Sequence, residues 1–434
     1  MLIEFKFGNF RSFRDEAVLS MEATGLSTFK NSLITYKTTK LLPSVVIYGK
    51  NGGGKSNVIR AFWLAVQFIR NAQRTQHEKA SIPVKPFLLN DTSVNEPTSF
   101  EFTYVLDEVK YTYGFAATKN CVVREYLYHA PKGQKSMVFE REYQTFTFRE
   151  NTEKRKRQLI SETVAPNQLY FAIACTMNEK ACIAAMKWFR EYLFFSRDYT
   201  DIPHQLLEYS EDTNMLNAIS NYAKMADLGI KDMKFEIKST ELDESLTFPE
   251  EMPEGIKAAL TTFMQALSDA PNSSETKLMM GEVNATSFHK GIDSDGTERL
   301  YPLKLSDESD GTRKLMAMAP GVERVLACGG VLLVDELEKE MHPMLFELIV
   351  SKFQSKTSNP NNAQLIFTTH NTELLNMELI RKDQIYFADK SRKDGSSSLY
   401  SISEFATPTT ENVRKGYLMG KYGATPDIEI EEVE

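Results

Sequence analysis

The chain has 434 residues, of which 42% are hydrophobic, and this combination excludes a disordered chain and predicts two or three packed units. Lys and Arg number 51 against 59 Asp and Glu, which gives a formal net charge of −8. That balance argues against a general nucleic-acid coat, because such proteins usually carry a strong basic excess.

Cysteine usage and hydropathy exclude further classes. The four cysteines show no CxxC spacing, and the six histidines complete no zinc pattern, so a disulfide scaffold and a zinc domain are disfavoured. The opening MLIEFKFGNF lacks the basic start and the long apolar run of a secretory signal. No segment approaches the roughly 18 apolar residues of a membrane span. We therefore expect a cytoplasmic protein without a membrane partner.

The N-terminal third predicts strands around one helix. Residues 2–7 alternate apolar and polar side chains and should pair with residues 16–21. Residues 44–48 (SVVIY) are typical of a strand buried on both faces, and a helical pattern follows shortly after them. Two alternating runs within 98–116 flank the turn sequence LDEV and predict a hairpin.

The middle of the chain follows different patterns. Residues 152–158 form a charged break. Helical patterns then extend from about 176 to 270, in the segments ACIAAMKWFREYLFF, NMLNAISNYAKMADLG and IKAALTTFMQALSD. Residues 271–300 are polar and rich in Gly, Ser and Asp, which indicates a loop or linker. No heptad persists over three or four repeats, so a long coiled coil is disfavoured.

Strands and helices alternate again after residue 300. The sequence predicts a helix near 310–328, a strand at 331–334, a helix near 343–356 and a strand at 364–368. Such alternation favours a parallel sheet that is covered on both sides by helices.

The strongest motif is a glycine-rich loop between the strand at 44–48 and the following helix. Its sequence, GKNGGGKS, fits G-x-x-x-x-G-K-[ST] and has the strand and helix that this phosphate-binding motif requires. Lys55 should reach the β- and γ-phosphates of a nucleotide, and Ser56 should ligate Mg²⁺. The alternative is a turn that binds nothing, which the two flanks disfavour. The residues expected around the nucleotide are Gly49, Asn51, Gly52, Gly53, Gly54, Lys55, Ser56 and Asn57.

Polar residues also follow two later strands. Asp335 and Glu336 end the run VLLV, and His370 ends QLIFTT; ligands gather at such strand ends in open α/β sheets. Asp335 would hold Mg²⁺ through water and Glu336 would act as general base, while His370 could contact a γ-phosphate or position water. A solvated acidic turn and a surface histidine are the simpler alternatives.

A fourth segment, SDESDGTRKL, begins the helix predicted near 310–328. Its Ser309 and Gly311 offer a hydroxyl and free N–H groups to an anion. From spacing alone we favour an ordinary helix N-cap.

Together these motifs resemble the ATP-binding-cassette (ABC) ATPases, in particular their SMC/RecF-like branch and the "AAA ATPase" proteins of the RloA and overcoming-lysogenization-defect type. YGKNGGGKSNVIRAF is similar to the Walker A motif of that branch, SDESDGTRKL to its signature, VLLVDELEKEMHP to its Walker B and D-loop, and IFTTHNTELL to its switch-histidine segment. The resemblance implies an α/β fold: an ABC-type P-loop ATPase head with an antiparallel β subdomain and a helical insertion. The implied domains are an N-terminal lobe at 1–175, the insertion at 176–299, a C-terminal lobe at 300–426 and an acidic tail at 427–434.

The resemblance also implies roles for individual residues. Ser309 and Gly311 would contact the γ-phosphate of ATP bound to a second copy of the chain, so that a head-to-tail homodimer, or a higher oligomer, would enclose two ATP molecules. Arg11 matches a position that touches nucleotide in SMC-like relatives, and His342 lies where the D-loop would cross the dimer interface. No residue of this chain matches the Q-loop glutamine of the family.

Two cellular roles follow from the resemblance. The first is a regulatory ATPase of bacterial anti-phage defence that controls a nuclease or toxin encoded separately, since the 64 residues after His370 are too few for the fused nuclease of some relatives. The alternative is a RecF-like ATPase that binds DNA in repair or replication, for which the basic run Lys154–Arg157 is the best support. A scaffold that binds ATP without hydrolysing it is a third reading, disfavoured by Glu336.

Overall fold

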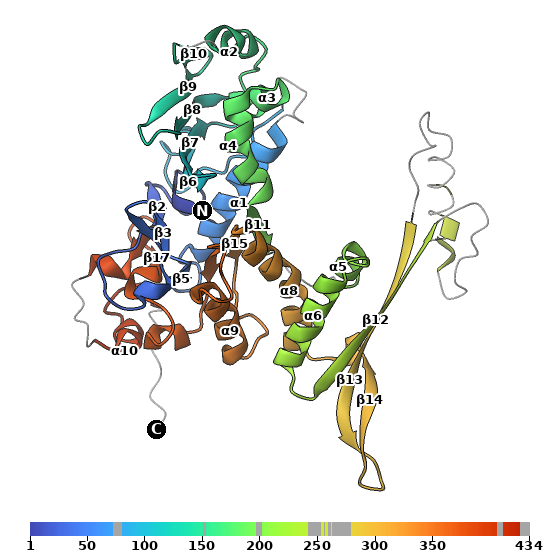
Figure 1. Cartoon of the computed structure of the whole chain (residues 1–434). Helices are drawn as coiled ribbons and strands as arrows, with labels where there is room; N and C mark the ends of the chain where they lie inside the picture. The colour runs from blue at the N-terminus through green and yellow to red at the C-terminus, as the bar shows by residue number, and fades with distance from the viewer. Residues whose placement is uncertain are drawn as a thin grey trace. The chain divides into compact units, whose positions relative to one another are not determined.

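The computed structural model describes residues 1–72, 80–150, 153–196, 202–241, 253–255, 257–258, 262, 279–405 and 411–425. Contacts divide the chain into a first unit, Met1–Asp198 with Gly321–Glu434, and a second unit, Tyr199–Pro320 (Figure 1). The acidic tail predicted at 427–434 lies outside the described residues.

The first unit contains a mostly parallel sheet to which both ends of the chain contribute (Figure 1). Its order is β11-β15-β16-β5-β17-β18, and only the pair β17–β18 is antiparallel. The uninterrupted apolar runs become β5, β15 and β16, which are buried along their whole length, so the predicted parallel sheet is confirmed. The strands are β5 (Ser44–Tyr48), β11 (Leu193–Ser196), β15 (Val331–Val334), β16 (Gln364–Thr368), β17 (Ile385–Lys390) and β18 (Ser397–Ser401).

A seven-stranded sheet, in which every neighbouring pair is antiparallel, forms the second layer of this unit. The predicted pairing of residues 2–7 with 16–21 and the hairpin within 98–116 are both present, and Asp107 and Glu108 form the hairpin turn with φ of 48° and 60°. The α/β class with an antiparallel β subdomain is therefore confirmed. In sheet order the strands are β10 (Thr145–Phe148), β9 (Ser136–Glu142), β8 (Val122–Ala130), β7 (Val109–Ala117), β6 (Thr98–Leu106), β1 (Leu2–Gly8) and β2 (Ala17–Ser20).

An aromatic core joins the antiparallel sheet to helix α1 (Lys55–Asn71). The ring of Phe62 on α1 lies 4.5 Å from that of Phe5 on β1 and 5.1 Å from that of Phe102 on β6, measured between centroids. All three side chains are almost completely buried, and aromatic pairs at such distances add stabilisation beyond the burial of their area. This packing fixes the helix that begins in the glycine-rich loop. The unit also contains helix α9 (Pro343–Gln354) and a hairpin of the two short strands β3 (Ile34–Tyr36) and β4 (Thr39–Leu41).

Two predictions between residues 152 and 196 were wrong. The charged break is the helix α2 (Lys154–Ser161), and the predicted helix through LFF ends at Glu191, after which residues 193–196 form β11 and pair in parallel with β15. A short apolar run fits a buried strand as well as a helix, so only its neighbour β15 decides the outcome. Helices α3 (Tyr170–Thr176) and α4 (Lys180–Glu191) consequently lie in the first unit.

One basic residue of the run at 154–157 is an internal structural group. The Arg157 guanidinium donates to Glu179 Oε1 at 2.8 Å and to the Val138 carbonyl at 3.2 Å, and its side chain is 5% exposed. Glu179 in turn caps α4 by accepting from the Cys182 N–H at 2.7 Å. Arg157 therefore links α2 to α4 and is not available to a nucleic acid.

Replacement of Arg157 by alanine should lower the free energy of unfolding by about 3–5 kcal/mol, because it leaves the Glu179 carboxylate buried without its partner. Replacement of Arg155, which is exposed on the same helix, should change that free energy by less than about 0.5 kcal/mol. Urea unfolding followed by circular dichroism measures both. Equal midpoints for the two variants would contradict the structural role of Arg157.

The second unit combines helices with a three-stranded antiparallel sheet of order β12-β13-β14. The helix predicted at NMLNAISNYAKMADLG is confirmed as α6, whereas most of IKAALTTFMQALSD lies outside the described residues. The loop predicted at 271–300 was wrong from residue 279 onwards, where two strands form. The sequence pattern did not predict β14, because this strand is exposed along its whole length and shows no apolar alternation. The elements are α5 (Ile202–Glu208), α6 (Thr213–Ala226), β12 (Ile230–Glu241), β13 (Met279–Ile292), β14 (Glu298–Lys304) and α8 (Asp310–Cys328), whose last residues enter the first unit.

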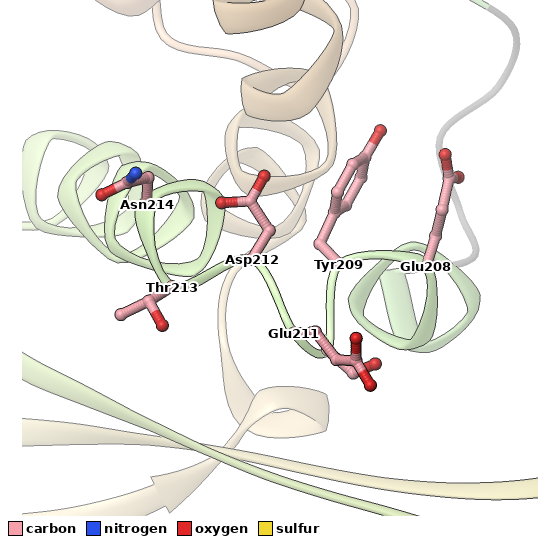
Figure 2. Close-up of a pocket in the computed structure, with 7 residues that line it drawn as sticks. Glu208, Tyr209, Glu211, Asp212, Thr213 and Asn214 are labelled. Atoms are coloured by element: carbon pink, nitrogen blue, oxygen red, sulfur yellow. The ribbon is translucent and has the colours of Figure 1, made fainter.

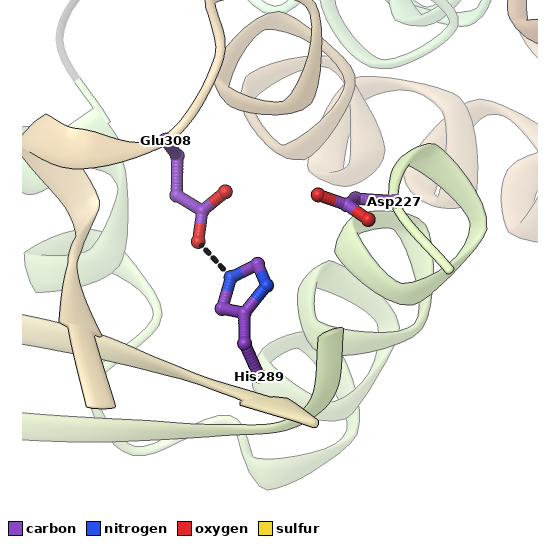
Figure 3. Close-up of side chains that lie close together, drawn as sticks. All are labelled: Asp227, His289 and Glu308. Carbon is purple, nitrogen blue, oxygen red and sulfur yellow. Dashed lines mark hydrogen bonds and ion pairs between the residues drawn. The ribbon is translucent and has the colours of Figure 1, made fainter. Parts of the chain in front are cut away.

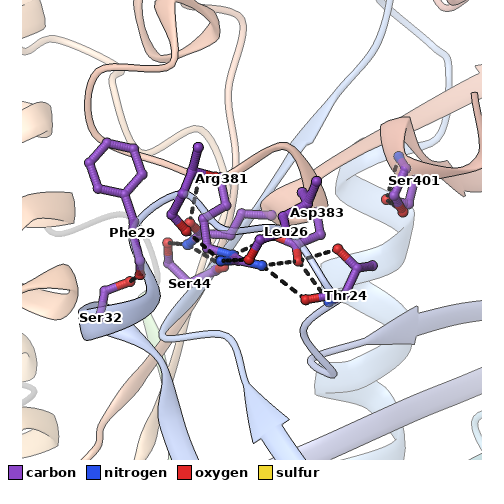
Figure 4. A network of polar contacts seen from close by, with 11 residues as sticks. Thr24, Leu26, Phe29, Ser32, Ser44, Arg381, Asp383 and Ser401 are labelled. Atoms are coloured by element: carbon purple, nitrogen blue, oxygen red, sulfur yellow. Dashed lines mark hydrogen bonds and ion pairs between the residues drawn. The ribbon is translucent and has the colours of Figure 1, made fainter. Parts of the chain in front are cut away.

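A buried polar network connects the N-terminal loops to β17 and β5 (Figure 4). Arg381 forms a two-pronged ion pair with Asp383, at 2.8 and 2.7 Å, and donates to the carbonyl groups of Leu26 and Thr24. Thr24 completes the ring by donating to Asp383 at 2.8 Å. Because every charged group is paired, the network fixes the entry to β17 without an uncompensated charge. Short 3₁₀ helices lie at Lys30–Ser32, Leu305–Asp307, Glu373–Asn376, Lys382–Gln384 and Ile402–Glu404.

Among the described residues, no helix is both long and apolar enough to cross a membrane.

Candidate active site

The glycine-rich loop, residues 49–56, connects β5 directly to α1. Gly49, Gly52 and Gly54 have φ of 153°, 74° and 119°, a region that side chains rarely adopt. A Cβ on Gly53 would lie 2.6 Å from the Ala388 carbonyl oxygen, one on Gly54 would lie 2.8 Å from the Ser397 hydroxyl, and one on Gly49 would overlap Ala388. The loop therefore packs closely against β17 and β18, and only glycine fits at positions 49, 53 and 54.

Lys55, the first residue of α1, is the buried cation of the loop. Its amine donates to the Gly49 carbonyl at 2.7 Å and to the Lys50 carbonyl at 3.3 Å, and the residue is 5% exposed. Burial lowers the pKa of this amine, and the negative charges of Glu336, Asp335 and Glu338 partly oppose that effect. Among the described residues this amine bonds to backbone carbonyls alone, and such a buried cation can form a stronger, charge-assisted bond with a phosphate oxygen.

The two predicted carboxylates follow β15, and a hydroxyl at the end of the neighbouring strand holds the side chain of the first and the backbone of the second. Thr368, the last residue of β16, donates to Asp335 Oδ1 at 2.6 Å and accepts from the Glu336 N–H at 2.8 Å. Glu336 has φ of 52°, an uncommon conformation for a residue with a side chain, and such conformations cluster at functional sites. Thr368 was missed by the sequence analysis, although its position next to Thr369 and His370 at a strand end was the available signal.

His370 lies at the same edge of the sheet. Its N–H donates to Glu338 Oε1 at 2.5 Å, its side chain is exposed, and the neighbouring Thr369 N–H donates to the Ile47 carbonyl of β5 at 3.2 Å. Since β16 lies between β15 and β5, these three strands end side by side. The residues that follow them, Lys55, Asp335, Glu336 and His370, therefore lie at one edge of the sheet. Ser56, the predicted Mg²⁺ ligand, directly follows Lys55 on α1.

Arg11 lies in a turn that packs on the start of α1. Asn57 donates to the Ser12 hydroxyl at 2.8 Å, and the Ser397 N–H donates to the Ser12 carbonyl at 2.6 Å. Arg11 itself has φ of 50°, and its Nε is buried without a hydrogen-bond partner among the described residues. Burial, and then the charge of Arg60, lower the pKa of the Arg11 guanidinium. The Asn57 side chain thus holds the turn, and its contact with nucleotide stays a prediction.

Ser309 and Gly311 belong to the second unit. The Ser309 hydroxyl accepts from the Thr312 N–H at 3.1 Å, which is the N-cap geometry that spacing alone favoured. Ser309 is exposed. Their contact with nucleotide stays a prediction.

The C-terminal segment YLMGKYGATP, residues 417–426, packs against β17 and the end of β5 through two tyrosines. Tyr417, on α10 (Val413–Leu418), and Tyr422 both stack on Phe387 of β17, with centroid distances of 5.3 and 5.6 Å. Tyr417 also lies 5.8 Å from the ring of Tyr48, the last residue of β5. This segment therefore supports the strand that leads into the loop.

A pocket of the second unit, between α5 and α6, is a poor candidate for the same chemistry. It is lined by residues 208–214, among them Glu208, Glu211 and Asp212 (Figure 2). Three carboxylates and no basic side chain would repel a phosphate group. None of the predicted site residues lines it.

Replacement of Thr368 by valine should lower the free energy of unfolding by about 1–3 kcal/mol, because the buried Glu336 N–H and the Asp335 carboxylate both lose a partner. The rate of ATP hydrolysis should fall as well, since the Asp335 carboxylate and the backbone of Glu336 lose their anchor. Thr368→Ser keeps the hydroxyl and should retain most of both properties. Urea unfolding and a phosphate-release assay measure them; a valine variant as active and as stable as the serine variant would contradict the anchoring role.

A family model described as "AAA domain, putative AbiEii toxin, Type IV TA system" matches residues 44–376 of the chain. A search of curated proteins finds no match. Similar solved structures include an SMC head bound to the C-winged helix domain of ScpA, with 11% identity, TM-score 0.38 and coverage of 92% of this chain and 97% of that one. The recombination mediator RecF with ATP has 14% identity, TM-score 0.38 and coverage of 92% and 99%. An Smc head with an extended coiled coil, bound to the C-terminal domain of ScpA derived from Pyrococcus furiosus, has 13% identity, TM-score 0.37 and coverage of 93% and 97%.

Proposed function

We propose that this protein, which belongs to the AAA-domain family whose model it matches, binds ATP at the glycine-rich loop and hydrolyses it to ADP and phosphate. One observation carries the proposal: the glycine-rich loop with its buried Lys55 follows β5, the Asp335–Glu336 pair follows β15, and these two strands end at the same edge of one parallel sheet with β16 between them. Nucleotides bind at this edge in open α/β folds.

The donor set fits Mg²⁺ as well as ATP. The Ser56 hydroxyl and the Asp335 carboxylate supply oxygen, the ligand that Mg²⁺ prefers, and Mg²⁺ usually keeps several waters and the phosphates as its other ligands. When bound, the ion would neutralise charge on the β- and γ-phosphates. Lys55 would bind the same phosphates through its buried amine.

The reaction would be an in-line attack of water on the γ-phosphorus. Glu336 would accept a proton from this water as the new O–P bond forms and the bond to the β-phosphate oxygen breaks. His370 would contact the γ-phosphate or position the water. The backbone of Glu336, held by Thr368, would orient its carboxylate.

We further propose an ABC-type, SMC/RecF-like mode of action, in which ATP joins two copies head to tail. Ser309 and Gly311 of one copy would contact the γ-phosphate bound to the other. The exposed position of Ser309 at the start of α8 supports this role, because a helix N-terminus with free N–H groups is suited to bind an anion. ATP binding would then be a switch between separate and joined copies.

As a cellular role we propose control of a separately encoded nuclease or toxin in anti-phage defence. The description of the matched family names a toxin and a TA system, which supports action together with another gene product. Affinity purification from native cells should recover one such effector in amounts that depend on ATP, and deletion of the gene should raise phage plating. Failure of both results would refute this role while leaving the ATPase proposal intact.

The alternative role is a RecF-like ATPase that binds DNA. The exposed Arg155 on α2 favours it, but Arg157 is committed to Glu179 and Lys156 donates to the Asn178 carbonyl. Binding of the purified protein to duplex DNA, measured with and without ATP over a range of salt concentrations, distinguishes the roles. Affinity that rises with ATP and falls steeply with salt would favour the alternative.

A further inference from the structure

Three side chains of the second unit that can ligate a metal converge, and none of them is a predicted site residue. Asp227 caps the C-terminus of α6, His289 lies on β13, and Glu308 directly precedes Ser309. Each offers one ligand atom, and the three atoms lie within 4.8 Å of one another. Figure 3 shows the imidazole ring of His289 facing the space between the two carboxylates.

The cluster is partly enclosed and contains two carboxylates. The Glu308 side chain is 4% exposed and that of His289 19%, with 2.8 Å between Glu308 Oε1 and His289 Nε2. Among the described residues, neither Asp227 nor Glu308 forms an ion pair with a lysine or an arginine. Two carboxylates in such surroundings are costly unless a positive charge compensates them.

Hydrogen bonds hold two of the three side chains in place. Asp227 Oδ1 accepts from the Gly229 N–H at 2.7 Å, and the Ser287 hydroxyl bonds to Glu308 Oε1. Outer partners of this kind orient ligands in metal sites and are found in most of them. A Cβ on Gly229 would lie 3.0 Å from Asp227 Oδ1 and 3.1 Å from His289 Nδ1, so the absence of a side chain at this glycine keeps the approach between these two groups open.

We propose that Asp227, His289 and Glu308 bind one divalent transition-metal ion of the Zn²⁺ class, with water as a further ligand. One nitrogen and two carboxylate oxygens are within the ligand set of zinc, and a dication neutralises the two carboxylates. Ligand distances of about 2.0–2.2 Å require the side chains to shift by about an ångström from their present separation. The ion would join the end of α6, the strand β13 and the start of α8, and would fix the residue next to Ser309.

The test is Zn²⁺ binding by the full chain, prepared without an affinity tag and saturated with Mg²⁺ and ADP. Isothermal titration calorimetry should show one tight site per chain, and Zn²⁺ should raise the melting temperature. His289→Gln and Glu308→Gln each remove a direct ligand, so either change should weaken binding by more than the roughly 10–100-fold that loss of an outer partner costs. Co²⁺ should give a visible absorption band that both variants lose.

Two controls separate this site from others. Glu340→Gln, which removes an exposed carboxylate of the first unit, and His129→Gln, which replaces a histidine of that unit, should both bind Zn²⁺ like the wild type. Circular dichroism shows whether each variant is folded. Absence of a Zn²⁺ site in the wild-type chain, or wild-type affinity in folded Glu308→Gln, would overturn the proposal and leave a histidine–carboxylate hydrogen bond alone.

Discussion

Lys55→Ala should lower the affinity for ATP on the order of 100-fold, because a phosphate loses a charge-assisted hydrogen bond from a desolvated cation. The same change should leave the free energy of unfolding nearly unaltered. Burial lowers the pKa of this amine, which means that the folded protein already disfavours its charge. Fluorescent-nucleotide titration measures the affinity and urea unfolding measures the stability. Loss of binding with unchanged stability identifies a binding residue and not a structural one.

Lys50 provides the matched control for Lys55 in the same loop. Its amine pairs with Asp389 at 2.9 Å and donates to the Lys390 carbonyl at 3.1 Å, and its side chain is 23% exposed. Such partly exposed pairs contribute about 0–1 kcal/mol, so Lys50→Ala should change the ATP affinity by less than about fivefold. If Lys55→Ala bound ATP as tightly as Lys50→Ala, the glycine-rich loop would not be the nucleotide site.

Glu336→Gln should slow ATP hydrolysis by a factor on the order of 10²–10⁴, the usual contribution of a general base, while ATP binding persists. Glutamine keeps the shape of the side chain, and the backbone N–H still donates to Thr368. Because the bound ATP is no longer consumed, the joined form of two chains should accumulate. Phosphate release measures the rate, and size exclusion with light scattering measures the mass with and without ATP.

Glu340→Gln is the control for this variant. Glu340 is exposed four residues further along the same segment, and its replacement should leave both the rate and the mass unchanged. Hydrolysis at the wild-type rate by Glu336→Gln would show that another group accepts the proton. A slow but monomeric Glu336→Gln would keep Glu336 as the base and reject the head-to-tail dimer.

Much of the fold and most of the candidate site could be predicted because their signals are local. The strand β5, the glycine-rich loop and α1 follow one another without interruption, so a motif of eight residues and its flanks specify the whole unit. The apolar runs of β15 and β16 were recognised in the same way, and the polar residues directly after them lie at one sheet edge. The end of a strand can be recognised from adjacent residues alone, because a polar residue directly follows the apolar run.

Other features could not be predicted from the sequence, because each of them depends on contacts between segments that are distant in the chain. LFF fits a helix or a strand, and its pairing with β15 decides the matter. Arg157 belongs to a basic run in the sequence, but Glu179 and Val138 make it an internal group. The exposed strand β14 has no apolar alternation, so only its pairing with β13 reveals it.

The sequence by itself determined the chemistry that this protein can offer: a lysine in a glycine-rich loop, two carboxylates and a histidine, each at the end of a buried strand. Only the tertiary structure decided that β16 lies between β15 and β5, so that Lys55 and the Asp335–Glu336 pair lie at one sheet edge, and that Thr368 holds the Asp335 carboxylate and the Glu336 backbone. It also decided that Asp227, His289 and Glu308 converge. The physical reason is that strand order and long-range packing depend on the burial of complementary faces, which no short window of residues encodes.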